Sequence, residues 1–183
     1  LILPPNIGRY VVATIPHAGI AYLAAFLERE GHSVEIADMR IDPSDENLFA
    51  QIKRFKPQLI GLSTASIGYK MSYEIVSKLK KSFPQIPISI GGSHVSTVHT
   101  KALEETEADY GVYGEGEKTF IELARNEPAE NIKGLIWRKE GSIVMNPPAP
   151  LAQDLDDFPY PAYEKFQLSK FLEKRIPLVT SRG

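Results

Sequence analysis

The sequence contains no cysteine among its 183 residues. Disulfides, thiolate zinc sites, iron–sulfur ligation and a cysteine nucleophile are therefore excluded within this chain. Long hydrophobic runs are also missing, since the longest, residues 18–27, is about half of the roughly 20 residues that a membrane-spanning helix needs. No basic segment followed by an apolar stretch opens the chain, so no signal peptide is indicated. We expect a soluble, cytoplasmic protein without a membrane partner.

An excess of charge of either sign is absent as well. Lys and Arg number 21 against 23 Asp and Glu, which leaves a net charge of -2. The broad basic surface that binds a phosphate backbone is missing, so we expect no nucleic-acid partner. The length and the 43% hydrophobic content suit one ordinary domain with an appendage. Because the first residue is Leu1 and not methionine, we interpret the chain as part of a longer protein.

Short apolar runs alternate with helix-period segments as far as about residue 126, which is typical of βαβ units and a covered parallel sheet. The first helix is indicated by an apolar stripe at Ile20, Leu23, Ala24 and Leu27, and the second by Ser44 as a cap before Leu48, Ile52 and Phe55. Strands are expected at 1–3, 33–38, 58–64, 87–92 and 109–114, with a weaker helix near 95–106. The right-handed crossover rule then predicts an α/β fold, a flavodoxin-like (Rossmann-like) doubly wound five-stranded parallel sheet of order 2-1-3-4-5.

The pattern changes after residue 131, so we divide the chain into residues 1–131, 132–146, 147–175 and 176–183. The second part predicts a β-hairpin about Glu140 that extends an edge of the sheet. The third is linker-like, with five of the fourteen prolines and an acidic string of three aspartates. Its aromatic residues Tyr160, Tyr163 and Phe166 are expected to pack on this domain or on a following one. The last part begins another strand without a sheet of its own.

Ligands of a doubly wound sheet bind outside the carboxyl ends of its strands. Small residues follow three neighbouring strands at this edge: Ser63, Thr64, Ser66 and Gly68; Gly91, Gly92, Ser93 and His94; and Gly114, Glu115 and Gly116. Glycine lets a flat group approach the backbone, and short hydroxyls donate hydrogen bonds without filling the space. Each set alone fits an ordinary turn, but three side by side predict a wide, polar crevice.

The common ligands of this fold lack their motifs here. After the first strand there is no GxGxxG, and the glutamate of Gly114-Glu115-Gly116 would oppose a phosphate. A Walker phosphate loop is absent. A phospho-receiver needs an aspartate where Ser63 ends the third strand, and a flavodoxin needs a hydroxyl-rich loop where Pro4 and Pro5 stand.

Seven segments together resemble the cobalamin-binding N-terminal domain of class B radical SAM (S-adenosylmethionine) proteins, the group that includes radical methyltransferases and anaerobic magnesium-protoporphyrin ester cyclase. They are LPP (3–5), GIAYLAAFLEREGHSVEIAD (19–38), PQLIGLST (57–64), IGGSH (90–94), YGEGEKTF (113–120), DLDDFPYP (154–161) and TSRG (180–183). Their order and spacing make the resemblance specific. In such proteins TSRG precedes a CxxxCxxC loop that holds a [4Fe-4S] cluster, so the resemblance implies that residues 176–183 are the first strand of a truncated radical SAM barrel.

The resemblance implies a base-off cobalamin with its corrin across the strand ends and its nucleotide tail in the crevice beside the third to fifth strands. Ser63 and Thr64 would bond the tail, Gly91 and Gly92 would let it pass, and residues 114–116 would flank it. The full set of implied cofactor-binding residues is Pro5, Ser63, Thr64, Ser66, Gly68, Gly91, Gly92, Ser93, His94, Gly114, Glu115 and Gly116. A valine at position 92 is expected to block the tail and leave the fold intact.

The implied function is to present this corrinoid to the protein's own C-terminal radical SAM barrel, for methyl transfer or related radical chemistry. The full-length protein would also hold a [4Fe-4S] cluster and S-adenosylmethionine, whereas this chain lacks the cysteine ligands and has no catalytic residue of its own. Two alternatives stay open: a module that docks the barrel or recognises substrate without a corrinoid, and a nucleotide-binding α/β protein.

One departure from other cobalamin proteins concerns the axial ligand. The DxHxxG motif of the mutases and methionine synthase does not occur here, so no histidine is expected below the cobalt. His17 is a candidate cobalt ligand by position, as is Tyr10, but we interpret His17 as a loop or helix-start residue. His94 is expected to touch the ligand or to cap the following helix, and we assign Glu115 and Glu117 to the positive end of a helix dipole.

Overall fold

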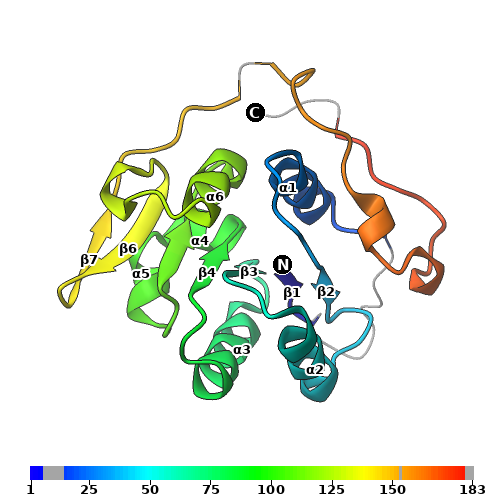
Figure 1. Ribbon diagram of the computed structural model, residues 1–183, viewed down its shortest axis with the longest axis horizontal. Helices are drawn as coiled ribbons and strands as arrows, with labels where there is room; N and C mark the ends of the chain where they lie inside the picture. Colours follow the sequence, from blue (N-terminus) through cyan, green and yellow to red (C-terminus); the bar gives the residue numbers. More distant parts are fainter. Residues whose placement is uncertain (6–14, 153, 180–183) are drawn as a thin grey trace.

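The computed structural model describes residues 1–5, 15–152 and 154–179. Five parallel strands form its centre: β1 (Ile2–Leu3), β2 (Ala37–Asp38), β3 (Ile60–Ser63), β4 (Ile88–Gly91) and β5 (Tyr110–Val112). Two antiparallel strands, β6 (Leu135–Lys139) and β7 (Ser142–Met145), extend the edge beside β5. The sheet order is β2-β1-β3-β4-β5-β6-β7 (Figure 1). The predicted doubly wound fold, the order 2-1-3-4-5 and the edge hairpin are confirmed.

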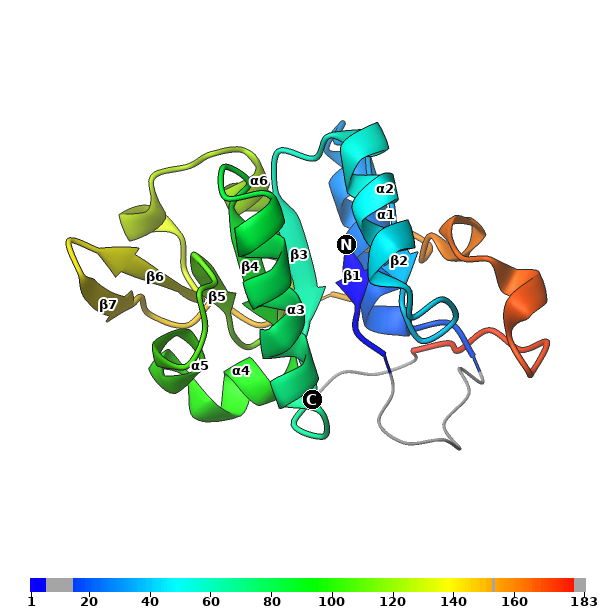
Figure 2. The same cartoon turned by 90° about the horizontal axis from the view of Figure 1, so that it is seen from below.

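Helices cover both faces of this sheet (Figures 1 and 2). On one face lie α1 (Ala18–Arg29) and α6 (Gly116–Ala124), and on the other lie α2 (Asp45–Phe55), α3 (Tyr69–Ser82), α4 (Ser93–Val98) and α5 (Thr100–Glu104). Ser44 caps α2 as predicted, because its side chain accepts a hydrogen bond from the amide of Asn47. No helix in the described parts of the chain is long and apolar enough to cross a membrane.

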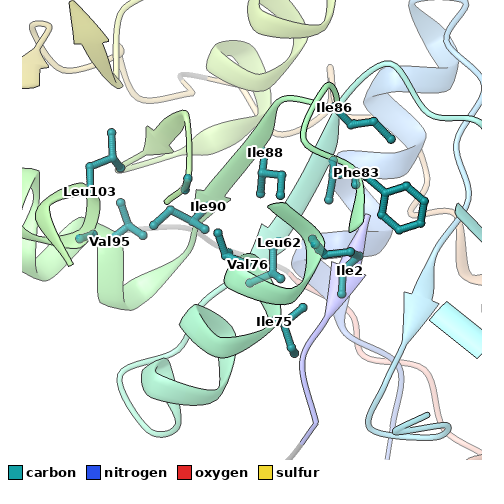
Figure 3. Packing of buried hydrophobic residues seen from close by; sticks show 14 of the residues in the cluster. Ile2, Leu62, Ile75, Val76, Phe83, Ile86, Ile88, Ile90, Val95 and Leu103 are labelled. Atoms are coloured by element: carbon teal, nitrogen blue, oxygen red, sulfur yellow. The ribbon is translucent and has the colours of Figure 1, made fainter. Parts of the chain in front are cut away.

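The largest part of the core lies between the sheet and the α2–α5 layer (Figure 3). Leu62 of β3, Ile88 and Ile90 of β4 and Val76 of α3 are each at most 2% exposed. Because successive strand residues point to opposite faces, Ser89 and Gly91 of β4 face α1 and α6 instead. The second face of the sheet therefore carries small residues where β4 approaches its carboxyl end.

Two predicted elements differ in length from those observed. The expected strand 33–38 pairs only at Ala37 and Asp38, since β1 offers it two partners, Ile2 and Leu3. The expected helix near 95–106 is broken in two at His99, whose φ of 50° is incompatible with a continuous right-handed helix.

The proline-rich segment after residue 147 returns to α1. Its residues Ala162, Tyr163, Phe166 and Phe171 are buried, and the amide of Ala162 donates to the carbonyl of Ala21 at 3.0 Å. Tyr163 and Phe166 thus pack on this domain, while Tyr160 is 98% exposed.

Residues 177–179, the described part of the expected last strand, form no sheet pairing. A strand needs a neighbour to bond with, and the described residues place none beside this segment. Residues 180–183 lie outside the described residues, as does Tyr10.

Candidate functional site

A cavity of about 180 Å³ reaches the carboxyl ends of β3, β4 and β5, between the sheet and the two helices α1 and α6. Its floor comes from the strands and its roof from the helices; the lining residues are Leu1, His17, Gly19, Ile20, Leu23, Gly61, Leu62, Ser63, Ser89, Gly91, Gly92, Val112, Gly114, Gly116, Glu117 and Phe120. A larger cavity of about 560 Å³ is lined by residues at the amino ends of the strands, among them Gln58 and Leu59. Because doubly wound sheets bind ligands at the carboxyl ends, we assign the site to the smaller cavity.

Strand pairing arranges the floor of this cavity in two rows. Ser63 lies opposite Gly91 in the row nearer the edge, and Gly61 lies opposite Ser89 in the deeper row. A strand rises about 3.3 Å per residue, so the rows are roughly 7 Å apart. The ring of Phe120 lies over Gly61, where an added β-carbon would be 2.5 Å from Cζ of Phe120. The deeper row is therefore closed over Gly61 by an aromatic side chain, while Ser89 still lines the cavity.

The position of Gly91, which lines the cavity, has room for an added β-carbon. A β-carbon there would meet only ordinary contacts, the nearest being the carbonyl oxygen of Val112 at 3.4 Å. Gly91 also has no left-handed backbone that would require glycine. The gap at this position is thus available to a flat group lying on the strand backbone.

Gly92 has a different role, which is to form the turn between β4 and α4. Its φ is 107°, and an added β-carbon would lie 2.9 Å from the carbonyl oxygen of Thr64. That same oxygen accepts a hydrogen bond from the amide of His94 at 3.1 Å. The expectation that valine at position 92 leaves the fold intact is wrong, because the residue would strain the turn before it reached any ligand.

The hydroxyl of Ser96 joins two of the strand ends. It donates to the carbonyl of Gly92 and accepts from the amide of Gly114, both at 3.0 Å. The turns after β4 and β5 are fixed to each other through this one side chain. Sequence reasoning missed Ser96, although its place one turn into the helix after IGG is a signal for such a contact.

His94 packs beneath the turn, away from the cavity. It is 7% exposed, its Nε2 lies 3.1 Å from the hydroxyl of Tyr73, and its ring stacks on Tyr69 at 4.3 Å between centroids. Burial lowers the pKa of His94, against the opposing charge of Glu105, and burial raises the pKa of Tyr73 to about 12. Both side chains are therefore neutral near pH 7, and His94 makes no cap for α4.

His17 begins α1, as expected for a helix-start residue. Its Nδ1 accepts a hydrogen bond from the amide of Ile20 at 3.2 Å. Burial and then the positive charge of Arg40 lower the pKa of His17, which keeps this nitrogen an acceptor. Within residues 1–5, 15–152 and 154–179, no group of three or more His, Asp or Glu side chains could hold a metal ion.

Two carboxylates lie at the start of α6. Glu117 is in its first turn, where the helix dipole favours an acid. Glu115 accepts a hydrogen bond from the amide of Ala152 at 2.7 Å, so it holds the C-terminal segment beside this edge. Neither arrangement is that of a pair of carboxylates poised for acid–base chemistry.

The cavity brings together five of the expected binding residues: Ser63, Gly91, Gly92, Gly114 and Gly116. Thr64 is fully buried and does not line it, Ser66 is exposed on the loop after β3, and Ser93 is exposed at the first position of α4. Gly68 is the N-cap residue before α3, with a φ of 91°. Pro5 does not line the cavity.

Sequence reasoning missed other residues that line the cavity, among them Ile20, Leu23, Ser89, Val112 and Phe120. For Ser89 a signal existed, because residues two apart in a strand share a face and Ser89 precedes Gly91 by two positions.

Residues 7–124 match the family model described as "B12 binding domain". The uncharacterized methyltransferase PH0819 of Pyrococcus horikoshii is 32% identical over 195 residues, which covers 100% of this chain and 42% of that protein. The anaerobic magnesium-protoporphyrin IX monomethyl ester cyclase of Synechocystis is 27% identical over 161 residues, covering 83% of this chain and 32% of that protein. The chain thus spans less than half the length of these curated relatives.

Solved structures of radical SAM enzymes share the fold. One is TsrM from Kitasatospora setae, a radical S-adenosylmethionine methyltransferase whose structure holds cobalamin and a [4Fe-4S] cluster. It superimposes on this chain with a TM-score of 0.66 and 26% identity, over 86% of this chain and 30% of TsrM. OxsB, a cobalamin-dependent radical enzyme, gives a TM-score of 0.72 at 20% identity over 88% of this chain and 24% of that one, which shows the fold alone. With its matching sequence, its doubly wound sheet and its small-residue strand ends, the chain belongs to the B12-binding domain family.

Proposed function

We propose that this chain binds cobalamin base-off and without a histidine ligand, with the corrin across the carboxyl ends of β3, β4 and β5 and the nucleotide tail in the 180 Å³ cavity. The observation that carries the proposal is the floor of the cavity at Gly91, where no side chain covers the strand backbone and a flat group can lie on it. When bound, cobalamin supplies a cobalt centre that can carry a methyl group.

The chemistry of the cavity suits the base of a nucleotide tail. Its helix side offers the apolar residues Ile20, Leu23 and Phe120, and its floor offers the hydroxyls of Ser63 and Ser89. An aromatic base is an apolar body with a few polar atoms, and binding sites for such ligands are mostly apolar with a few placed polar groups.

Ligation of cobalt by histidine is disfavoured by what the described histidines already do. His17, the only histidine among the described residues that line the cavity, accepts a hydrogen bond at Nδ1 from the amide of Ile20. Its neutral ring therefore carries the proton on Nε2, which leaves neither nitrogen with a free lone pair for cobalt. His94 is stacked against Tyr69 and bonded to Tyr73. We therefore assign the axial position below the cobalt to no described side chain.

We further propose that the corrinoid is presented to a radical SAM barrel of the same protein, which would hold the [4Fe-4S] cluster and S-adenosylmethionine. The likeness to TsrM at 26% identity supports this partner. The C-terminal segment supports it too, because Leu172, Ile176 and Leu178 are between 53% and 76% exposed. Apolar side chains gathered on one segment are typical of a surface that another domain covers.

The test is to mix the purified chain with hydroxocobalamin, remove free ligand by gel filtration and record the visible spectrum. We expect about one corrinoid retained per chain, with the spectrum of a base-off form. A chain that retains none would instead be a docking module without a corrinoid.

A further inference from the structure

Ser89 carries a buried hydroxyl without a partner. The residue is 1% exposed, and its Oγ has no hydrogen bond. A hydroxyl taken out of water without a partner costs free energy, so buried polar groups are normally satisfied. Three other buried side-chain atoms among the described residues share this condition, in His32, Thr64 and Ser72. Of the four, only the hydroxyl of Ser89 belongs to a residue that lines the candidate cavity.

The position of Ser89 is at the far end of the path into the cavity. A group that enters from the strand ends passes Ser63 and Gly91 first and then reaches the row of Gly61 and Ser89. The ring of Phe120 closes the space above Gly61 in that row. The leading edge of an inserted base therefore comes to the Ser89 hydroxyl.

We propose that Ser89 selects the lower base of the corrinoid, an inference that rests on the proposed function. The cavity is built for bases whose leading edge carries a hydroxyl or an amino group, as in hydroxybenzimidazole or an aminopurine, in preference to 5,6-dimethylbenzimidazole. A serine hydroxyl can donate one hydrogen bond and accept others, so it pairs with either polar group. The two methyl groups of dimethylbenzimidazole leave it unpaired, and a buried unpaired hydroxyl weakens the complex.

The experiment varies the lower base of the ligand and, separately, the residue at position 89. Dissociation constants are measured by absorbance titration of the full 183-residue chain with 5-hydroxybenzimidazolyl cobamide, 5,6-dimethylbenzimidazolyl cobamide and cobinamide, which has no lower base. The proteins are the native chain, Ser89→Ala and the control Ser82→Ala, at an exposed position at the end of α3. Removing an unpaired hydroxyl does not harm the fold, so Ser89→Ala is expected to melt at or above the native temperature.

We expect the native chain and Ser82→Ala to bind the hydroxybenzimidazolyl cobamide roughly ten-fold more tightly than the dimethyl form. In Ser89→Ala this preference disappears, while cobinamide binds all three proteins equally. Equal affinities in the native chain, or a preference that survives in Ser89→Ala, would overturn the role of Ser89 and leave corrinoid binding standing. Failure of all three corrinoids to bind would overturn the proposed function itself.

Discussion

Replacing Gly91 by valine should close the cavity without harming the sheet. The nearest atom to an added β-carbon is the carbonyl oxygen of Val112 at 3.4 Å, and the backbone at Gly91 is not left-handed. Valine also suits a strand, where β-branched side chains pack well. Its methyl groups would occupy the row that faces Ser63, on the path toward Ser89.

The size of the effect follows from the area that the tail buries. An aromatic group of this kind buries about 150–250 Å². At about 25 cal/mol per Å² this is worth about 4–6 kcal/mol as an upper estimate. Since about 1.4 kcal/mol is a factor of ten in affinity, we expect Gly91→Val to weaken cobalamin binding by at least about 100-fold.

The assay compares two ligands on three proteins by absorbance titration. Cobalamin has the tail and cobinamide lacks it, so Gly91→Val should bind both with the affinity that the native chain has for cobinamide. Gly91→Ala, which adds one carbon to the same open space, should fall between. An unchanged affinity of Gly91→Val for cobalamin would refute the reasoning, and so would an equal loss for cobinamide.

Three further predictions concern stability. Gly92→Ala should lower the free energy of unfolding by at least about 1 kcal/mol, because the backbone at Gly92 has a left-handed φ of 107°. Urea denaturation should show that Gly92→Ala is less stable than Gly91→Ala, and equal stabilities of the two variants would contradict this prediction. Burial lowers the pKa of His94 in the folded chain below its ordinary 6.5, so the contribution of His94 to stability should be constant above that value and fall as pH falls through it, since the unfolded chain then binds more protons. Burial also lowers the pKa of the Leu1 amino group to about 6 and lowers the pKa of His17, so these two groups add to the same slope. His94→Gln should therefore reduce, but not remove, the slope between pH values of about 7.5 and 5.5, and an unchanged slope would exclude His94 as a contributor. Phe171→Ala should lower the free energy of unfolding by about 3 kcal/mol, because Phe171 is 3% exposed, and should speed proteolysis after residue 147. The control is Leu168→Ala, at a position that is 41% exposed. Equal effects of the two substitutions would argue against docking of this segment on α1.

Much of the fold could be predicted because buried parallel strands are short apolar runs. The runs that became β3, β4 and β5 stand out between helical stripes, and the handedness of crossovers then orders them. The length of β2 could not be predicted, since it depends on how many residues β1 offers as partners. The break at His99 also escaped, because a single left-handed residue in a weak helical pattern leaves no periodic signal.

The sequence indicated the rim of the candidate cavity but not its deeper lining, and the binding role of these residues stays a prediction. Glycines and hydroxyls after a strand end are visible as a cluster, which is how Ser63, Gly91 and Gly114 were found. Ser89 lies inside a strand, where an isolated polar residue is taken for part of the core unless one asks which face of the sheet its side chain points to. The docking of residues 158–171 on α1 could not be predicted either, because aromatic residues in a proline-rich segment show no period that identifies their partner.

The most direct test of the central claim is the electron paramagnetic resonance spectrum of the Co(II) form of cobalamin bound to this chain. Free cob(II)alamin shows a three-line splitting from the nitrogen of its own base on cobalt. We predict that this splitting disappears on binding, because the base lies in the cavity and no histidine replaces it. A bound corrinoid that keeps a nitrogen splitting would contradict the account.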